Sequence, residues 1–582
     1  MLLGTYLFLT RNTFWNLYRR LRRIITLDTR LYPFRYEAPS YHWFCETKLE
    51  GRVIWRAFSV RDSAALEKAH LYRGKDNVNI VSTDGGRYDV NLSERKRNPV
   101  YWDAPACEVR RCSWFHKGNN ENYFTPFEEH IADILECEYR ISYERDDWFR
   151  VAVLLNGDTI TFNGPYSLAL SCSEIPGRTR AIKRGIDDEF DIKDDESETV
   201  EHLIFAVHGI GPICDLKLRT IEEVVDIFRD KTLKHIQQNK RYRNRIEVLP
   251  INWHYKVHRG KANVDRNLQR ITLPTMPLLR NFTNDTLVDI LLYISPTCQD
   301  QEFSCSTFST APFSQIILET VSSELTRLFV LFKKRHPTFC GEVSLLGHSL
   351  GSVILFDLLL HQKAKENVDL TTAGGNNKND NGQIHLKYPQ LPFRPIGLFT
   401  LGSPIALFLT VRGVDMLGVN FKLPTCPTFV NIFHPCDPVA YRIEPLICAE
   451  MEKLKPAVLP HYGSRRSRIK NALVKVTASA KQTVTSCLLF LRTTGLSTAT
   501  SSHSHIHILD DLTSRYENLE TKGELGMLNK GRRIDYALQG SDVEFLNEYV
   551  CGITSHACYW DSDDVILYIL EELCGGKGRF RN

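Results

Sequence analysis

Long hydrophobic runs are absent from the sequence. No stretch reaches the ~18 consecutive apolar residues that a membrane-spanning helix needs. The first nine residues are apolar, but they carry no leading positive charge and no clear small-residue cleavage site. We therefore expect neither a membrane-spanning helix nor a signal peptide.

Paired cysteines are also lacking. The 16 cysteines of the 582-residue chain form no C-x-x-C pair and show no spacing typical of metal ligands. Cysteines dispersed in this way are typical of a long, reduced chain, so we predict an intracellular protein. The glycosylation sequons at Asn91, Asn281 and Asn284 then have no expected use.

A strong excess of one charge is missing as well. The 73 basic and 69 acidic residues leave a net charge of +4, which gives no argument for a nucleic-acid partner, and we expect none. The basic segment Arg11–Leu27 fits an amphipathic helix on an anionic membrane and, equally well, a surface helix packed on the next domain. A second basic run, Arg465–Lys470, could meet lipid phosphates, although a solvated surface is the more frequent reason for such a run.

The chain length predicts two or three domains. Residues 36–177 contain five of the eight tryptophans, together with short alternating runs and glycine-containing turns, and predict one compact β-rich module. Residues 178–200 are charged and poor in apolar residues, which is typical of a solvated linker. We expect residues 1–35 to form a separate basic segment and residues 483–507 to form a flexible insert.

Alternating strands and helices predict an α/β fold for residues 201–425, completed by residues 390–577. Besides the elements discussed below, we expect strands at Ile246–Ile251 and Gly397–Leu401, and helices at Glu222–Phe228, Asp285–Tyr293, Gln315–Phe332 and Val565–Leu573.

Residues 342–360 have the sequence EVSLLGHSLGSVILFDLLL, which predicts a strand, a tight turn and a helix. The turn carries the pattern G-x-S-x-G, which by itself is frequent by chance. Between a buried strand and a helix it is typical of the nucleophile elbow of α/β-hydrolases. Such a strained turn needs small residues on both sides, here Gly347 and Gly351. We therefore predict Ser349 as the nucleophile, at a helix N-terminus that favours developing negative charge.

A second glycine-bearing turn, HGIG, follows the predicted strand Leu203–Val207. An early turn of this kind often supplies one N–H donor of an oxyanion hole. We predict the donors at Gly209 and Ile210, together with the N–H of Leu350 after the nucleophile. Losing one such donor typically costs ~2.7–4 kcal/mol of barrier. We interpret His208 as a structural residue rather than a general base.

The other triad members are expected in the chain order Ser, acid, His. Asp437 comes just after the predicted strand Phe429–Phe433, where the acid belongs, although Asp before Pro is also common turn chemistry. His556 precedes the predicted final helix, the usual place of the general base. His434 and His461 are less well placed, because one precedes the acid and the other lacks a preceding strand.

Several stretches carry a more specific signal. They include TDGGRYDV, PVYWDAP, HLIFAVHGIG, GHSLGSVILFDLL, HPCDPVAYRIEP, NKGRRIDYALQ and SHACYWDSDDV. Together they resemble the intracellular phospholipases A1 that carry a DDHD domain, also called phosphatidic acid-preferring phospholipases A1. The resemblance implies an α/β-hydrolase-like lipase core, with a DDHD domain at residues 390–577 and a small N-terminal β-rich WWE-like domain. The four residues that name the DDHD domain correspond to Asp437, Asp535, His556 and Asp564.

The resemblance further implies removal of the sn-1 acyl chain of phosphatidic acid and related glycerophospholipids, without a cofactor, by a Ser-His-Asp mechanism. It implies a cytoplasmic protein that associates peripherally with organelle membranes and binds anionic phospholipids; homo-oligomer formation stays open. Two alternatives also stay open: a catalytically weak, lipid-binding trafficking factor, and a metal-dependent phosphoesterase that uses the Asp/Asp/His/Asp set. We prefer the triad, with Asp535 and Asp564 as supporting residues, because Ser349, Asp437 and His556 fill three roles in order.

Overall fold

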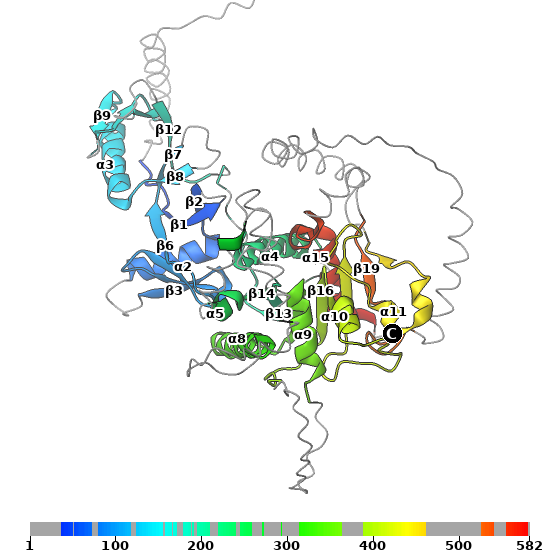
Figure 1. Cartoon of the computed structure of the whole chain (residues 1–582). Coiled ribbons are helices and arrows are strands. Elements are labelled where there is room, and N and C mark those ends of the chain that lie inside the picture. The colour runs from blue at the N-terminus through cyan, green and yellow to red at the C-terminus, as the bar shows by residue number, and fades with distance from the viewer. Residues whose placement is uncertain are drawn as a thin grey trace, which may run out of the picture. The chain divides into compact units, whose positions relative to one another are not determined.

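The computed structural model describes residues 36–49, 52–72, 79–117, 124–154, 157–165, 167–171, 179–187, 189–190, 192, 195–209, 219–239, 242, 245–258, 270–272, 293, 313–363, 388–460, 525–539 and 554–579. It comprises two compact units, Met1–Asp195 and Glu196–Asn582 (Figure 1). Some predicted features lie outside the described residues: the segment 1–35, the donor Ile210, the helix Asp285–Tyr293 apart from Tyr293, the basic run Arg465–Lys470 and the insert 483–507. No helix within the described ranges is long and apolar enough to cross a membrane.

The N-terminal unit begins with an antiparallel sheet and one helix. The described strands lie in the order β2-β1-β6-β5-β4-β3. The elements are β1 (His42–Leu49), β2 (Arg52–Ala57), α2 (Val60–Leu71), β3 (Ile80–Thr83), β4 (Tyr88–Asn91), β5 (Lys96–Pro99) and β6 (Cys107–Cys112). The Ser59 side chain caps α2 by accepting a hydrogen bond from the N–H of Asp62. Trp43, Leu66 and Val90 share one buried apolar cluster.

A second antiparallel sheet follows, with described strands in the order β8-β7-β12-β11-β10-β9. Its elements are β7 (Trp114–Lys117), β8 (Phe124–Pro126), α3 (Glu129–Arg145), β9 (Arg150–Val153), β10 (Thr159–Phe162), β11 (Leu168–Ser171) and β12 (Thr179–Arg184). Trp114 and Trp148 are buried in its core together with Tyr139 of α3. The tryptophans of this part therefore serve packing.

The predicted boundaries of the N-terminal unit differ from the structure. One module was expected over residues 36–177, followed by a solvated linker over 178–200. Instead, two sheets follow each other, and β12 lies inside the predicted linker, paired with β7 and β11. Most residues around β12 are polar or charged, but Ile182 and Phe190 pack against the core of the second sheet. A few apolar side chains therefore make this segment part of the folded unit, although its average composition is polar.

The second unit is built on a parallel sheet. Seven described strands lie in the order β14-β13-β15-β16-β17-β19-β18, and each neighbouring pair is parallel. Their bounds are β13 (Val200–Val207), β14 (Arg245–Ile251), β15 (Glu342–His348), β16 (Gly397–Leu401), β17 (Phe429–Phe433), β18 (Ala457–Val458) and β19 (Asp535–Ala537). A parallel sheet buries both faces, which explains continuous apolar runs such as Leu203–Val207. The predicted α/β fold is confirmed.

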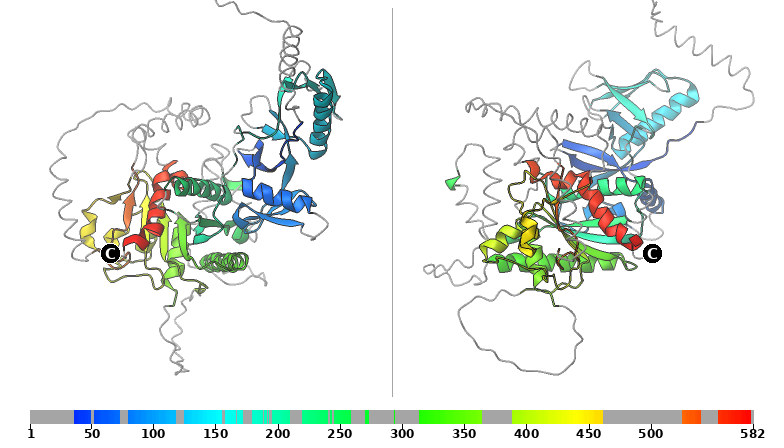
Figure 2. Two further views of the ribbon diagram at one scale, coloured as in Figure 1. Left: turned by 180° about the vertical axis from the view of Figure 1, so that it is seen from behind. Right: turned by 90° about the vertical axis from the view of Figure 1, so that its right-hand side faces the viewer.

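Helices cover both faces of this sheet. They are α4 (Ile221–Gln238), α5 (His254–His258), α8 (Phe313–Arg335), α9 (Leu350–Leu360), α10 (Ile405–Val411), α11 (Glu444–Ile447) and α15 (Asp563–Arg579). On one face α4 and α15 lie side by side (Figure 2), and Phe228 and Ile569 share a core with Ile432 of β17. On the other face, α9 packs against α8 and α10. There Phe356 of α9 contacts Phe429 of β17, with ring centroids 5.9 Å apart.

Candidate active site

The carboxyl ends of four neighbouring strands meet at one edge of the parallel sheet. Gly209 comes after β13, Ser349 after β15, Gly402 after β16 and Asp437 after β17. In open parallel sheets this edge is the usual position of a ligand site. The topology therefore places the predicted residues where a site is expected.

Ser349 stands between β15 and α9 in a strained conformation. Its backbone angles are φ 53° and ψ −130°, a combination that a non-glycine residue rarely adopts. Its N–H donates to the Leu401 carbonyl over 3.0 Å, and Ser352 Oγ donates to the Ser349 carbonyl over 2.5 Å. These bonds hold the strand–turn–helix geometry that the G-x-S-x-G pattern predicts.

Glycines allow other backbone segments to approach this turn. A Cβ at Gly351 would lie 2.4 Å from the carbonyl oxygen of Val207, and one at Gly209 would lie 2.3 Å from Leu350 N. A Cβ at Gly347 would also collide, with the backbone of α9. Since backbone cannot yield as a flexible side chain does, packing requires small residues at these positions.

The same close contact places Gly209 beside a predicted oxyanion donor. Leu350 is the first residue of α9, so its N–H has no acceptor inside the helix. The turn after β13 is anchored by Trp253, whose Nε1 donates to the carbonyl of His208 over 2.9 Å. The other predicted donor, Ile210, lies outside the described residues.

Asp437 and His556 are brought together from distant parts of the chain. Nδ1 of His556 lies 2.9 Å from Oδ2 and 3.0 Å from Oδ1 of Asp437. Because a carboxylate only accepts hydrogen bonds, the imidazole proton is on Nδ1, and Nε2 is left as an acceptor. This is the relation of acid and general base in a hydrolase triad.

Two further donors bind Asp437. Tyr559 Oη donates to its Oδ2 over 2.5 Å, and the N–H of Val439 donates to its Oδ1 over 2.9 Å. Burial by itself raises the pKa of Asp437, but the His556 imidazole and these hydrogen bonds hold it below its ordinary value. Asp437 is therefore ionised at neutral pH. The sequence analysis missed Tyr559, for which the only signal is its position shortly after His556.

The two atoms that react first in a triad are Oγ of the serine and Nε2 of the histidine. Among the described residues, neither Ser349 Oγ nor His556 Nε2 forms a hydrogen bond, although both atoms are buried. Buried polar atoms are normally satisfied, and exceptions concentrate at catalytic sites. Catalytic hydrogen bonds often form only when substrate binds. Ser349 and His556 thus keep the atoms that a nucleophile and a base use.

His348 ties the elbow to the segment of His556. Its Nε2 lies 2.7 Å from the backbone carbonyl oxygen of His556, and the two ring centroids are 4.8 Å apart. Burial, reinforced by the neighbouring His556, lowers the pKa of His348 to about 3. The ring is therefore neutral and donates its Nε2 proton. The G-x-S-x-G pattern alone does not indicate this role for its second residue.

Gly402 makes room for the acid–base pair. Its φ is +57°, which favours glycine, and a Cβ there would lie 2.6 Å from Asp437 Oδ2. The same Cβ would lie 2.8 Å from Tyr559 Cε2 and 3.1 Å from His556 Nδ1. The sequence signal for this residue is weak: a Gly-Ser-Pro turn directly after a predicted strand.

The four residues that name the DDHD domain have different surroundings in the structure. Asp437 pairs with His556, whereas Asp535 accepts hydrogen bonds from Asn431 and from the backbone at residues 443 and 444. Asp564 is partly buried in the first turn of α15. Among the described residues, no group of three or more His, Cys, Asp or Glu side chains could hold a metal ion.

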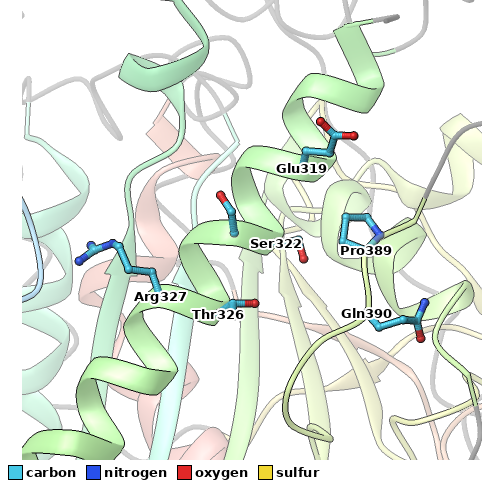
Figure 3. Close-up of a pocket in the computed structure, with 7 residues that line it drawn as sticks. Glu319, Ser322, Thr326, Arg327, Pro389 and Gln390 are labelled. Carbon is cyan, nitrogen blue, oxygen red and sulfur yellow. The ribbon is translucent and has the colours of Figure 1, made fainter.

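A groove of about 530 Å³ lies between α8, from Glu319 to Arg327, and the residues Pro389 and Gln390 (Figure 3). Its lining from α8 consists of Glu319, Ser322, Ser323, Thr326 and Arg327, so three hydroxyl side chains lie between two charged ones. The described lining includes none of Ser349, Asp437 and His556. We therefore do not assign this groove to the substrate.

Family comparisons agree with the architecture. A family described as the DDHD domain matches residues 391–507 and 500–574, the segments that carry Asp437 and His556. Families described as the WWE domain match residues 41–111 and 116–188, which correspond to the two antiparallel sheets.

Similar proteins cover most of the chain. Triacylglycerol hydrolase DDHD2 of Mus musculus is 34% identical, over 94% of this chain and 94% of that protein. SEC23-interacting protein of Homo sapiens is 31% identical, over 93% of this chain and 72% of that protein. Intracellular phospholipase A1 of Caenorhabditis elegans is 28% identical, over 70% of this chain and 52% of that protein.

Proposed function

This chain belongs to the DDHD-domain phospholipase A1 family, and on that basis we propose that it is a serine-dependent lipid hydrolase. Its reaction is removal of the sn-1 acyl chain from phosphatidic acid and related glycerophospholipids. The observation that carries this proposal is the strained Ser349 in a site where Asp437 orients His556. Within the described part of the chain, neither the Ser349 hydroxyl nor His556 Nε2 has a hydrogen-bond partner.

In the first half of the reaction, Ser349 Oγ attacks the ester carbonyl carbon while His556 Nε2 takes the hydroxyl proton. The carbonyl oxygen becomes an oxyanion, which the N–H of Leu350 and an N–H of the turn at Gly209 stabilise. Asp437 holds the imidazole in the productive tautomer and stabilises the imidazolium. The ester C–O bond then breaks, and His556 returns the proton to the leaving glycerol oxygen.

In the second half, water attacks the acyl-enzyme ester on Ser349. His556 Nε2 takes a proton from this water and then gives it to Ser349 Oγ as the acyl–oxygen bond breaks. A free fatty acid leaves, and the other product is a 2-acyl lysophospholipid. Every bonding change uses side chains of this chain and water, so the scheme needs no cofactor.

The lipid substrate also determines where the enzyme acts. Phosphatidic acid is an anionic membrane lipid, so the proposal includes peripheral association with organelle membranes. The relatives differ in the substrates that their names give, since one is named a triacylglycerol hydrolase and another a phospholipase A1. Phosphatidic acid and triacylglycerol are therefore the two substrates to compare directly.

The test measures fatty acid release by mass spectrometry from phosphatidic acid vesicles and from triacylglycerol emulsions. Ser349→Ala should lower release by at least ~10³-fold, because the reaction loses its nucleophile. Ser323→Ala is the matched control, since Ser323 is exposed on α8 and bonds only the carbonyl of Thr320 in the described contacts. Activity of Ser349→Ala within tenfold of the parent contradicts the serine mechanism. Release confined to triacylglycerol keeps the mechanism and overturns the phospholipid substrate.

A second candidate is a lipid-binding trafficking factor with little catalysis. The observation in its favour is the 31% identity to SEC23-interacting protein. Covalent labelling of the purified chain by a fluorophosphonate separates the two, because the label needs an activated serine. Labelling that disappears in Ser349→Ala supports the hydrolase, and absence of labelling in the parent supports the trafficking factor.

A further inference from the structure

Asp535, the first residue of β19, is a buried carboxylate outside the proposed triad. Its exposed fraction is 0%. It accepts hydrogen bonds from Asn431 Nδ2 over 2.9 Å, from the N–H of Ile443 over 3.1 Å, and from the N–H of Glu444 over 3.1 Å. A carboxylate removed from water in this way is retained only where its acceptor atoms are used.

Two of these bonds come from the backbone of the segment that follows the proposed acid, and the third comes from Asn431 of β17. Asp437 lies between the end of β17 and Ile443, where Asp535 holds the main chain. Asn431 extends the contact, since its Nδ2 also donates to the carbonyl of Tyr441 over 3.0 Å. One carboxylate thus binds this loop directly at Ile443 and indirectly at Tyr441.

Two further bonds of the described residues attach this loop near the proposed active site. The N–H of Tyr441 donates to the carbonyl of Ser403, and the N–H of His434 donates to Tyr559 Oη. Both bonds involve neighbours of the acid–base pair. A shift of the loop at Tyr441 therefore moves the backbone on which Asp437 approaches His556.

A second carboxylate fixes Asp535 in turn. Glu444 accepts hydrogen bonds from Arg533 Nε and Nη2, each over 2.8 Å, and from the N–H of Ile534. Its Oε1 also accepts the N–H of Asp535 over 3.2 Å, so the two residues hold each other's main chain. Arg442 lies beside both carboxylates. The charges facing Asp535 are therefore Glu444, Arg442 and Arg533.

We propose that Asp535 is a positioning residue that sets the distance between the Asp437 carboxylate and His556 by holding the backbone of residues 441–444. The inference rests on the proposed function, because it assigns Asp437 as the triad acid. It differs from a purely structural role in one consequence. Loss of Asp535 should impair the chemical step more than it impairs folding.

Electrostatics favours that consequence. Burial, together with the charge of Glu444, disfavours the ionised form of Asp535 and raises its pKa to about 6. The negative charge of Asp535 is therefore not a source of folding stability. Asp535→Asn removes this charge and keeps the volume. The amide has one acceptor oxygen where Asp535 uses two, so it cannot serve Asn431 and both backbone N–H groups.

The experiment compares Asp535→Asn with Glu247→Gln in the full chain. Glu247 is a matched control, because it is a buried carboxylate paired with Arg245 on β14, away from the acid loop. On p-nitrophenyl butyrate, kcat of Asp535→Asn should fall roughly 10²-fold at unchanged KM, as expected for displacement of a catalytic group by about 1 Å. The value of kcat is corrected for the folded fraction from circular dichroism. Glu247→Gln should keep kcat.

Two further measurements prevent confusion with misfolding. The downfield proton resonance of the His556 Nδ1–H, identified by its loss in His556→Gln, should shift or vanish in Asp535→Asn and persist in Glu247→Gln. Asn431→Ala removes the indirect link from Asp535 to Tyr441, together with the bond from Thr400 Oγ1, but keeps the direct bonds of Asp535 to the N–H groups of Ile443 and Glu444. It should therefore lower kcat by a smaller factor in the same direction. This variant carries the test if Asp535→Asn fails to fold.

The outcomes are distinct for the two proposals. If Asp437→Asn leaves kcat unchanged, the triad and hence the proposed function are wrong. If Asp437→Asn lowers kcat strongly while Asp535→Asn and Asn431→Ala only change the melting temperature, the triad stands and the positioning role of Asp535 is overturned.

Discussion

In the elbow, the proposed nucleophile is held by close contacts between backbone segments, whereas the proposed acid, Asp437, is held by hydrogen bonds to its carboxylate. A single added carbon at Gly351 would lie 2.4 Å from the carbonyl oxygen of Val207. Asp437, by contrast, is held by Tyr559 Oη, the N–H of Val439 and the His556 imidazole. The turn at Ser349 requires that its neighbouring glycines carry no side-chain atoms. The carboxylate of Asp437 instead requires hydrogen-bond partners, of which His556 and Tyr559 come from a distant part of the chain.

The difference predicts two kinds of sensitivity. Close backbone packing leaves little room for adjustment, because interiors are densely packed and resist added volume. A hydrogen-bond network can lose one member and keep the others, so its failures are graded. Changes in the elbow should therefore affect folding and activity together, while changes around Asp437 should affect the reaction first.

The largest effect is expected for Asp437→Asn. The amide cannot hold His556 in the productive tautomer, and turnover of p-nitrophenyl butyrate should fall ~10⁴-fold, as in a serine protease triad. Circular dichroism should show a folded chain, since the shape of the side chain is kept. Unfolding in place of a specific loss of turnover would remove the distinction between the two regions.

Asp564→Asn is the control for this prediction. Asp564 is partly buried in the first turn of α15, where a carboxylate favours the helix N-terminus. Its replacement should lower turnover less than Asp437→Asn does, or act through stability. The reverse order of the two effects would mean that the acid is assigned to the wrong residue.

Gly402→Ala joins the two regions, because Gly402 is a backbone position that touches the hydrogen-bonded pair. The added Cβ, 2.6 Å from Asp437 Oδ2, should displace the carboxylate and lower kcat roughly 10²-fold. The positive φ should cost about 1–2 kcal/mol of stability in addition. Gly413→Ala provides the control, since Gly413 has φ +81° and no atom within 4 Å of the added carbon. A loss of kcat as large in Gly413→Ala would show that backbone strain alone is responsible.

The smallest effect is expected from the pH dependence of stability. The pKa of His348 is about 3 in the folded protein, below the ordinary value of about 6.5, so the unfolded chain binds more protons as the pH falls below that value. Stability from neutral His348 is therefore fully present above about pH 6.5 and is lost as the pH falls, by up to about 1.4 kcal/mol per pH unit. His348→Gln keeps an N–H donor but cannot titrate.

The measurement is the free energy of unfolding in urea at pH 7.5 and pH 5.5. The parent should lose more stability than His348→Gln between these values. Asp437, whose pKa is lowered, loses its contribution only at more acidic pH, and it does so in both proteins. Equal losses in the two proteins would show that His348 is not buried as a neutral ring.

Local pattern was enough for much of the parallel-sheet unit. The predicted strands Gly397–Leu401 and Phe429–Phe433 occur with those bounds, and the helix after Ser349 ends at Leu360. Each of these elements is encoded within a few neighbouring residues, by an apolar run or by helical spacing. The glycines around Ser349 belong to the same class, because a strained turn excludes side chains whatever lies nearby.

Composition was a poorer guide where the signal was sparse. The boundary expected at residue 177 was wrong because β12 has few apolar residues, and the charged average of its surroundings hid Ile182 and Phe190. Strand pairing is a tertiary event: β12 is a strand because β7 and β11 offer it hydrogen-bonding edges and an apolar core. No window of sequence around β12 contains those partners.

The sequence by itself determined the α/β fold, the elbow and the chain order in which an acid and a histidine were to be sought; their catalytic roles stay predictions. Only the tertiary structure decided what surrounds them. It brought Asp437 within hydrogen-bond distance of His556, which lies 119 positions away in the chain. It also placed Tyr559 and Gly402 in contact with that pair, and it hydrogen-bonded Asp535 to the backbone of the loop that follows Asp437. The physical reason is that backbone preference and hydrophobic period act over a few residues, whereas a buried hydrogen bond needs partners that only the folded chain brings within 3 Å or so.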